Sequence, residues 1–443
     1  MELAALAAEA YVYGCPLVRD LSVVEGFMHT GFGPLPPTPF NHFAHADRSS
    51  AADMPFMPDD DTVRSVVHLD LSGGPVLLRL PRTDGADGAY RVFQFVDAWT
   101  NNFAYVGRRA GHARAGEWLI APPGWAGSVP DGVLGVVDAP TSVVSVIGRD
   151  ICDGLDGPVD PARGRALQEQ LGVTHVEPGT HRTGLPAPDP DVPEALTFFE
   201  RLRVWMADFP PSAPDQAYQD RFQPLGLLEE GPSPYTRAGP ALVRALTEGA
   251  ARGRAWVEEA SRAAAARGGW VLDPHLHDYN LDHYRVGTVD SPEWRIADRE
   301  ASYRTRAVAA RGSLWGVHGY EAVCARAFSD AGGERLNGAR SYVLRFEGPP
   351  PVGAGWSLAV YDLAGRRIGE ALAGCGPVYG DQGGPSAVRI GRERPDAPDA
   401  PESADANRLS VPDGEFHLVL RLCAPGPGIL DGTYVFPAVE RTR

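Results

Sequence analysis

Short runs of alternating apolar and polar residues, closed by glycine, proline or aspartate, constrain the fold of this chain more than any other feature. The first run spans residues 63–71, where valine, serine and leucine occupy the odd positions and Arg64, His68 and Asp70 lie among the even ones. A period of two is typical of a β-strand with one buried face. The turn signals SGGP and DGADG separate this run from PVLLRLP and AYRVFQFVDAW. Similar runs continue to residue 150, so the sequence predicts an antiparallel β-sandwich over roughly 55–150.

The regions on either side of this sandwich differ in their periodicity. Residues 2–14 have apolar positions at helical spacing and predict a short helix that ends at Gly14 and Pro16. The proline-rich linker at 183–193 precedes a stretch of helical spacing that ends near residue 270. Alternating runs then return and predict a second β-domain. Within that domain, residues 392–407 are too polar to form a core and are expected to be a surface loop.

We therefore predict a mainly β chain with two antiparallel sandwiches and an α-helical domain between them. The expected domains are the N-terminal helix plus the first sandwich at 1–185, the helical domain at 193–270, and the second sandwich at 271–443.

Composition restricts the chemistry that this chain can perform. The sequence contains no lysine, so all 41 basic residues are arginines. This excludes Schiff-base chemistry and the phosphate-binding lysine of nucleotide hydrolases. A net charge of −16 argues against a nucleic-acid or anionic-membrane partner, because phosphate groups are bound by basic surfaces. A dinucleotide-binding glycine fingerprint is also missing, so we expect no organic cofactor.

The compartment is predicted from the N-terminus and the cysteines. The first residues lack the charged and long apolar regions of a signal peptide, and no run of 18 apolar residues occurs. The 5 cysteines are odd in number and widely spaced, which is typical of reduced thiols. We expect a cytoplasmic protein that contacts neither membrane nor nucleic acid. The sequence leaves open a homo-oligomer.

The acidic stretch MPDDDTVRS at 57–65 is the first candidate functional motif. Its carboxylates, Asp59, Asp60 and Asp61, allow three interpretations. They can accept backbone N–H bonds in a loop before the strand, which is the interpretation that we favour. Asp61 can instead be a functional carboxylate. A metal site is the third interpretation, but the pattern of a calcium-binding loop is missing.

The stretch VDAWTNNFAYVGRR is the second candidate. Asp97, Trp99 and Asn101 end a strand with large residues on both faces, and Arg108 and Arg109 follow in a short loop. A carboxylate, an amide, an indole and guanidiniums at the rim of a sandwich suit a small polar ligand. The alternative is a structural Asp97–Arg109 pair that holds the loop. If Asp61 and Asp97 share a cleft, their repulsion would raise one pKa and give an acid and a base.

Several segments together resemble a known two-part family. PDDDT, LDLSGGPVLLRLP, VDAWTNNFAYVGRR, GEWLIAPPGWAGSVPDG and APTSVVSVIGRD resemble the family catalogued as domain of unknown function 1254. RAVAARGSLWG, GWSLAVYD and FHLVLRLCAPGPGILDGTYVFPAV resemble its usual partner, domain of unknown function 1214. The resemblance covers most of the chain and implies a jelly-roll-like C-terminal sandwich. It implies no particular reaction.

The chain departs from that family in its polar motifs. Where the family tends to have proline, asparagine, arginine, aspartate and threonine, this chain keeps only Pro58, Asp61 and Thr62. Arg109 matches the arginine of a second motif, whereas the threonines that follow it in the family are absent here. These departures imply that this chain has a substrate different from those of other family members.

Two further segments contain candidate ligands. DPHLHDYNLDHYR at 273–285 contains His275, His277 and His283, and His-x-His on a strand would place two imidazoles on one face for a metal. We favour a solvated loop and keep the metal as the alternative. Trp356 and Tyr361 in GWSLAVYD are expected in the core and a turn, or otherwise in a ligand groove between the domains.

From these residues we predict a cytoplasmic enzyme that acts on a small polar metabolite by cofactor-free acid–base catalysis. It would be a lyase, isomerase, cyclase or hydrolase, with a role in secondary metabolism left open. Asp61 would be the acid or base, Asp97 would position the substrate, and Arg109 would hold an anionic group. The expected substrate contacts are His68, Trp99, Asn101, Trp356 and Tyr361. A carbohydrate- or small-ligand-binding protein and a subunit of a larger assembly are the alternatives.

Overall fold

The computed structural model describes most of the chain, in which helices and strands are present in similar amounts. The prediction of a mainly β protein is therefore only partly correct. The described residues are 2–46, 63–83, 90–112, 114–151, 161–177, 179–261, 266–267, 269–363, 367–375, 387–392 and 408–442. The candidates Asp59, Asp60 and Asp61 lie outside these ranges, as does nearly all of the predicted loop at 392–407.

The N-terminal β-region consists of two sheets. The first has the strand order β1 (Ala44–Ala46), β2 (Val63–Asp70), β8 (Val143–Ile151), β4 (Tyr90–Asp97) and β5 (Asn102–Gly107), and all of its pairs are antiparallel. The second has the order β7 (Gly135–Asp138), β6 (Gly116–Ala121), β3 (Val76–Leu80) and β9 (Gly172–His175), with β6 and β7 parallel. One hydrophobic cluster contains residues of both sheets, among them Val67, Phe95, Leu78 and Ile120. The two sheets therefore pack against each other.

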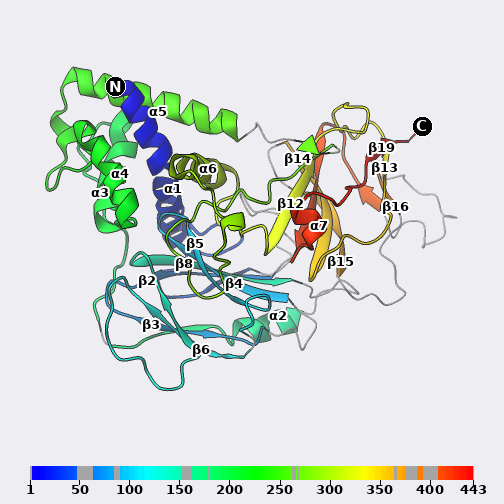
Figure 1. Cartoon of the computed structure of the whole chain (residues 1–443), viewed down its shortest axis with the longest axis horizontal. Coiled ribbons are helices and arrows are strands. Elements are labelled where there is room, and N and C mark those ends of the chain that lie inside the picture. Colours follow the sequence, from blue (N-terminus) through cyan, green and yellow to red (C-terminus); the bar gives the residue numbers. More distant parts are fainter. Residues whose placement is uncertain are drawn as a thin grey trace.

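Helix α1 (Leu3–Thr30) is twice as long as the sequence predicts and continues through Gly14 and Pro16. The glycine is tightly packed, because a Cβ there would come within 2.4 Å of the Leu202 side chain. Contact with neighbouring helices thus compensates for the backbone hydrogen bond that Pro16 cannot make. Figure 1 shows α1 descending from the N-terminus onto the first sheet.

This helix also explains an error in the predicted strand. Residues 64–71 were expected to have one exposed face, but all of them are buried, including Arg64, His68 and Asp70. The ring of Phe27 on α1 meets the ring of His68 edge to face, with 4.7 Å between the centroids. The first sheet is therefore covered by the second sheet on one face and by helices on the other.

The helical region packs around α1. It comprises η2 (Glu194–Leu196), α3 (Thr197–Asp208), α4 (Ala213–Gln219), η3 (Asp220–Leu225), η4 (Pro234–Arg237), α5 (Pro240–Ala260), η5 (Pro292–Trp294) and α6 (Arg299–Gly312). Helix α6 falls in the range that was assigned to the second sandwich, yet its residues Tyr303 and Ala310 share the hydrophobic cluster of α1. A separate short helix, α2 (Pro161–Gln168), precedes β9.

The C-terminal β-region, on the right in Figure 1, also has two sheets. The larger has the order β10 (Ala266–Arg267), β11 (Trp270–Val271), β12 (Ala322–Ala327), β18 (Phe416–Cys423), β14 (Gly355–Asp362) and β15 (Arg367–Cys375). The smaller has the order β17 (Arg408–Ser410), β16 (Ala387–Gly391), β13 (Tyr342–Arg345) and β19 (Val439–Arg441), with β16 and β17 parallel. Both sheets contribute to one hydrophobic cluster, to which the short helix α7 (Pro427–Leu430) adds Ile429. Among the described residues, no helix is long and apolar enough to cross a membrane.

Candidate functional site

Asp97, at the end of β4, holds the turn that leads into β5. Its Oδ1 accepts hydrogen bonds from the backbone N–H groups of Trp99 (2.9 Å) and Asn101 (2.8 Å), and its Oδ2 accepts one from Asn101 Nδ2 (2.9 Å). Thr100 in this turn has a φ of 67°, a left-handed conformation that a threonine adopts only under constraint. Burial raises the pKa of Asp97, and the hydrogen bonds from Asn101 oppose that rise. The Asp97 carboxylate therefore stabilises the turn, and its catalytic role stays a prediction.

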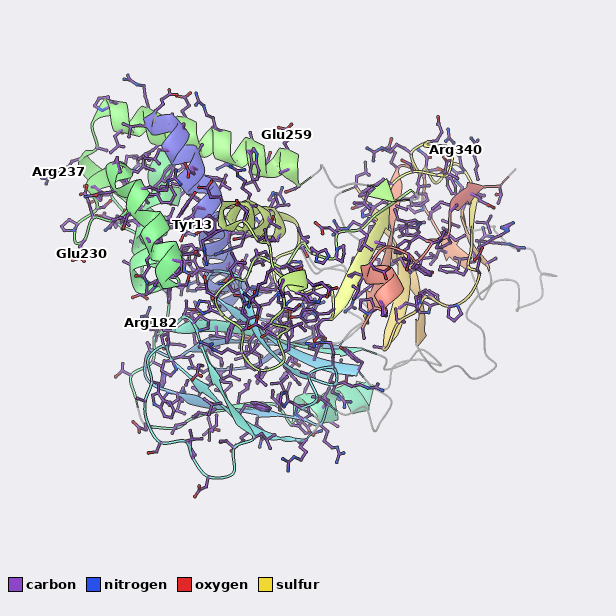
Figure 2. All side chains as sticks on the ribbon, viewed as in Figure 1. Tyr13, Arg182, Glu230, Arg237, Glu259 and Arg340 are labelled. Carbon is purple, nitrogen blue, oxygen red and sulfur yellow. The ribbon has the colours of Figure 1, made fainter. Side chains whose placement is uncertain are left out.

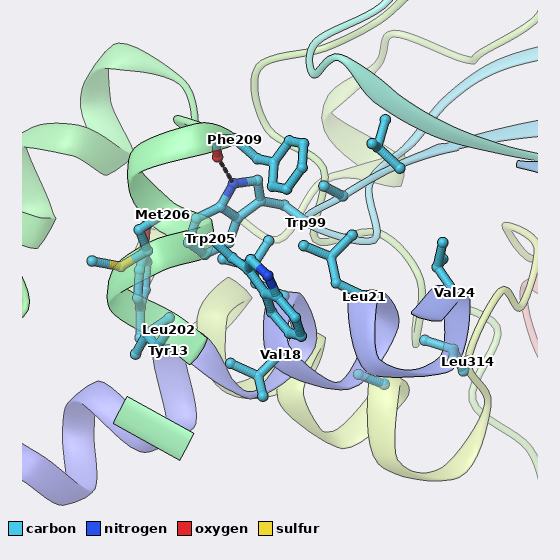
Figure 3. Packing of buried hydrophobic residues seen from close by; sticks show 14 of the residues in the cluster. Tyr13, Val18, Leu21, Val24, Trp99, Leu202, Trp205, Met206, Phe209 and Leu314 are labelled. Atoms are coloured by element: carbon cyan, nitrogen blue, oxygen red, sulfur yellow. Dashed lines mark hydrogen bonds between the residues drawn. The ribbon is translucent and has the colours of Figure 1, made fainter. Parts of the chain in front are cut away.

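Trp99 anchors the same turn to the helical region. Its indole N–H donates to the carbonyl oxygen of Phe209 at 2.8 Å, as Figure 3 shows. The side chain is buried among residues of α1 and α3, including Leu21 and Trp205. It therefore joins the sheet to the helices, and little of it is available to a ligand.

Arg109 pairs with Glu321 rather than with Asp97. The Arg109 guanidinium donates to Glu321 and to the carbonyl oxygen of Gly287, and it lies over the Tyr320 ring at 4.5 Å. Glu321 also accepts a hydrogen bond of 2.7 Å from the Tyr90 hydroxyl. The alternative of an Asp97–Arg109 pair is therefore wrong, because each of the two side chains is held by other partners. Arg109 instead connects the first sheet to the segment before β12.

The predicted substrate contacts do not gather in one place. His68 is buried under α1, where its Nδ1 lies 2.8 Å from Ser145 Oγ, and burial lowers its pKa to about 3. Trp356 belongs to the hydrophobic cluster between the two C-terminal sheets, whereas Tyr361 belongs to a cluster with Ala359 and Val419. Tyr361 lies five positions after Trp356, an odd step along the strand, so the two side chains project from opposite faces of β14. These two side chains therefore cannot line one groove.

The histidine-rich segment forms turns over residues 274–279, and the His-x-His pair does not lie on a strand. His275 is half-exposed and pairs with Asp278 at 2.6 Å, whereas His277 is buried and its pKa is lowered by burial to about 4. Within the described ranges, no three histidine, cysteine or acidic side chains gather as metal ligands. His283 lies elsewhere, beside the Asp97 turn.

A small polar cavity brings His283 and the Asp97 turn together. It is lined by Asp97, Trp99, Asn101, Asp215, Asp282, His283 and Arg306, among others. Burial lowers the pKa of His283, and the negative charges of Asp97 and Asp282 oppose this effect. The cavity volume is about 10 Å³, which is room for about one water molecule. Polar residues that were predicted for this rim therefore line one cavity, but the cavity is too small for a substrate.

A much larger pocket lies in the helical region. Its volume is about 580 Å³, within the usual range for small-molecule sites. We call it the tyrosine pocket, and its principal lining residues are Glu9, Tyr13, Tyr218, Arg221, Trp256, Glu300 and Tyr303. They come from α1, α4, η3, α5 and α6. Figure 2 shows Tyr13 where α1 passes between the other helices.

The floor of the tyrosine pocket is a cluster of aromatic rings. Tyr218 and Tyr303 have ring centroids 4.5 Å apart, and Tyr13 meets Tyr303 edge to face at 5.0 Å. Trp256, on α5, is 38% exposed, which is unusual for so large an apolar side chain. Such a wall offers stacking surfaces to a flat molecule.

Two tyrosine–carboxylate pairs occur in this wall. The Tyr218 hydroxyl donates to Glu9 Oε1 at 2.6 Å, and the Tyr303 hydroxyl donates to Asp215 Oδ1 at 2.7 Å. Burial raises the pKa of both phenols, and the acceptor carboxylate of each raises it further. Both phenols therefore remain protonated at neutral pH.

Arginines form ion pairs with both carboxylates. Arg221 lies 3.0 Å from Glu9, while Arg299 and Arg306 lie 2.5 and 3.5 Å from Asp215. Asp215 also lines the small polar cavity, so the Tyr303–Asp215 pair separates that cavity from the tyrosine pocket.

The tyrosine pocket was not predicted from the sequence. Its residues are spread from Glu9 to Tyr303 over five elements and form no short motif. One signal was present: Glu9 interrupts the apolar run of the first helix. A carboxylate at such a position needs a partner, and the structure supplies Tyr218 and Arg221.

Two models of protein families match separate parts of this chain. The family model described as "Protein of unknown function (DUF1254)" matches residues 40–175, and the one described as "Protein of unknown function (DUF1214)" matches residues 321–427. The predicted resemblance is thereby confirmed in both parts and in their order. The residues of the tyrosine pocket lie outside both matched ranges. No curated protein sequence matches this chain.

Two solved structures are similar over the whole chain. The VPA0106 protein from Vibrio parahaemolyticus has a TM-score of 0.69 and 20% sequence identity, with 100% of both chains covered. A putative uncharacterized protein from Burkholderia cenocepacia has a TM-score of 0.44 and 10% identity, with 100% of this chain and 94% of that one covered. The first similarity shows a shared fold, and the second is too low to support an argument.

Proposed function

We propose that this chain, which belongs to the two-part family with a DUF1254 region ahead of a DUF1214 region, is an enzyme that acts on a small metabolite by cofactor-free acid–base catalysis. The site that we assign to this activity is the tyrosine pocket. One observation supports the assignment most: two tyrosine–carboxylate pairs lie side by side in the wall of a pocket of about 580 Å³.

The chemistry follows from the direction of the two hydrogen bonds. An ionised carboxylate can only accept, so each phenol must donate its single proton to its carboxylate. A bound molecule can then transfer a proton to the tyrosine oxygen while the phenolic proton passes to Glu9 or Asp215. The reverse transfer returns a proton to another atom of the same molecule. A pair that accepts a proton in this way and then returns it to another atom would support an isomerase or a lyase.

A non-catalytic small-ligand-binding protein is the second candidate. The arginines favour it, because Arg221 pairs with Glu9 while Arg299 and Arg306 pair with Asp215, so both carboxylates already take part in ion pairs. In that case the same wall would bind a molecule without changing it.

Incubation with a fractionated small-molecule extract of bacterial cells distinguishes the two candidates. We expect at least one mass-spectral feature to be consumed by the wild-type protein and left intact by Tyr218→Phe and Tyr303→Phe. Tyr235→Phe is the matched control, since that buried hydroxyl donates to the Leu225 carbonyl outside the pocket. Binding without conversion would support the second candidate, and consumption that persists in both pocket variants would refute our assignment.

Asp61 is retained as a separate proposal, since it lies outside the described residues. If it is the catalytic base, Asp61→Asn should abolish the same conversion while Tyr303→Phe leaves it intact. An active, folded Asp61→Asn protein would remove Asp61 from the mechanism.

The finer assignment of the fold belongs to the proposal as well. We propose that each pair of sheets is a β-sandwich and that the C-terminal pair is jelly-roll-like, because each pair shares one hydrophobic cluster. We also propose a cytoplasmic location, which the unpaired thiol of Cys15 supports.

A further inference from the structure

We infer that the tyrosine pocket recognises a ring-shaped molecule with two neighbouring hydrogen-bond donors, such as two adjacent hydroxyl groups. This inference rests on the proposed function and names the class of substrate for the same site.

The first step concerns the two phenolic oxygens. Tyr218 donates to Glu9 and Tyr303 donates to Asp215, so neither hydroxyl has a proton left to offer to a ligand. A phenolic oxygen retains acceptor capacity after it has donated its proton. Towards a bound molecule both groups can therefore act only as acceptors, and a partner must supply the hydrogens.

The second step concerns spacing. The rings of Tyr218 and Tyr303 lie with centroids 4.5 Å apart and an angle of 52° between their planes. Both line the tyrosine pocket, and Glu9, which receives the Tyr218 proton, lines it too. Because the two rings are adjacent, one small molecule that lies against both can offer a hydrogen-bond donor to each tyrosine.

The third step concerns the body of the ligand. Tyr13 and Trp256 add aromatic surface to the wall, and the exposed Trp256 lies on α5, across from α4 and α6. Flat rings gain from stacking on such surfaces, and sugar-like rings pack against them through their apolar face. The pocket thus combines a surface for a ring with acceptors for its substituents.

The fourth step concerns the charged residues of the lining. Arg221 bridges Glu9 at 3.0 Å and Glu300 at 3.4 Å, and Arg252 pairs with Glu248. Arg304 is exposed, and its charge is solvated. The charges of Glu9, Arg221 and Glu300 are paired with one another, so recognition beside the aromatic rings depends on hydrogen bonds and stacking. This favours a neutral molecule.

The proton step for such a substrate is balanced within the pocket. A substrate hydroxyl gives its proton to the Tyr303 oxygen as the Tyr303 proton moves to Asp215 Oδ1. The products are a substrate alkoxide or phenolate and a neutral Asp215, and the step needs no oxidant or co-reactant.

The test uses two molecules with the same ring system, 2,3-dihydroxynaphthalene and its dimethyl ether 2,3-dimethoxynaphthalene, of which only the first has hydroxyl donors. Each is titrated into the whole protein by calorimetry or ligand-observed NMR. The wild-type protein should bind the diol about tenfold more tightly than the dimethyl ether, the effect of one to two hydrogen bonds. Tyr218→Phe and Tyr303→Phe should each reduce this preference, since each removes one acceptor. Tyr235→Phe should preserve it.

Three results would overturn the inference: equal affinities in the wild-type protein, a preference that survives both pocket variants, or no binding of either molecule at millimolar concentration. Each pocket variant carries a single substitution, so if one of them does not fold, the other still tests the inference. The variant Trp256→Ala distinguishes a failure of this inference from a failure of the proposed function. If it weakens both molecules equally, the pocket binds small molecules and only the requirement for two donors is wrong.

Discussion

The rings of Tyr218 and Tyr303 lie side by side, with 4.5 Å between their centroids, although 84 residues separate them in the chain and each hydroxyl is bound to a carboxylate of another helix. Tyr218 on α4 bonds to Glu9 on α1, and Tyr303 on α6 bonds to Asp215 on α4. The tyrosine pocket is therefore held open by hydrogen bonds between helices. The stability of this helical assembly and the chemistry of the pocket depend on the same groups.

Asp215→Asn tests this dependence. Asp215 is 3% exposed and accepts hydrogen bonds from Tyr303, Arg299 and Arg306, so loss of its charge removes an ion-pair partner of the buried Arg306. We expect the free energy of unfolding to fall by about 3 kcal/mol, the usual effect of breaking a buried charge pair. Urea denaturation measures it, with the exposed Asp220→Asn as control. A loss no larger than that of the control would show that Asp215 does not hold the helices together.

Two glycine substitutions test the packing of α1 against α5. A Cβ on Gly249 would lie 2.3 Å from the Cβ of Ala7 and 2.8 Å from its carbonyl carbon, so Gly249→Ala forces the two helices apart. We expect a loss of about 2 kcal/mol from such overpacking. Gly26 in α1 has nothing within 4 Å of an added Cβ, so Gly26→Ala should stabilise the helix by about 0.5–1 kcal/mol. Thermal unfolding of both variants gives the comparison, and shifts of the same sign would contradict it.

The fold could be predicted from sequence where its determinants are local. The period-two run at 63–71 and the runs that follow correctly located β2, β3 and β4, because alternation and turn residues are local properties. The burial of His68 was missed because it depends on α1, whose continuation through Pro16 is set by tertiary contacts. The tyrosine pocket was missed for the same reason: proximity of residues so far apart in sequence is decided by helix packing.

The Asp97 turn shows the opposite case, a motif whose residues were identified correctly but whose role the structure redefines. Asp97→Ala would leave the buried N–H groups of Trp99 and Asn101 without their acceptor. We expect a loss of about 3 kcal/mol in the free energy of unfolding, since each unsatisfied buried donor costs about 1–3 kcal/mol. Asp97→Asn keeps an acceptor oxygen and should lose less. Normal stability with abolished turnover in both variants would instead support the catalytic role that the sequence suggested.

The buried histidines predict a dependence of stability on pH. Burial lowers the pKa of His68 from 6.5 to about 3, and within the described residues its Nε2 has no hydrogen-bond partner. Below pH 6.5, His68 binds a proton in the unfolded chain but stays neutral in the folded protein. The contribution of neutral His68 to the free energy of unfolding is therefore complete above pH 6.5 and is lost as the pH falls towards about 3. The loss is about 1.4 kcal/mol per pH unit.

His68→Gln removes this contribution, so its unfolding free energy should fall less steeply than that of the wild-type protein as the pH is lowered. Urea denaturation at a series of pH values measures the difference between the two curves, and His29→Gln, which replaces an exposed histidine of α1, is the control. The difference is the informative quantity, because the pKa of Asp278, raised by burial to about 6, acts in the opposite direction. This carboxyl stabilises the folded protein while it is protonated, and the effect cancels between the curves. Parallel curves for the wild-type protein and His68→Gln would mean that His68 takes up its proton without unfolding, and that α1 does not seal this face of the sheet.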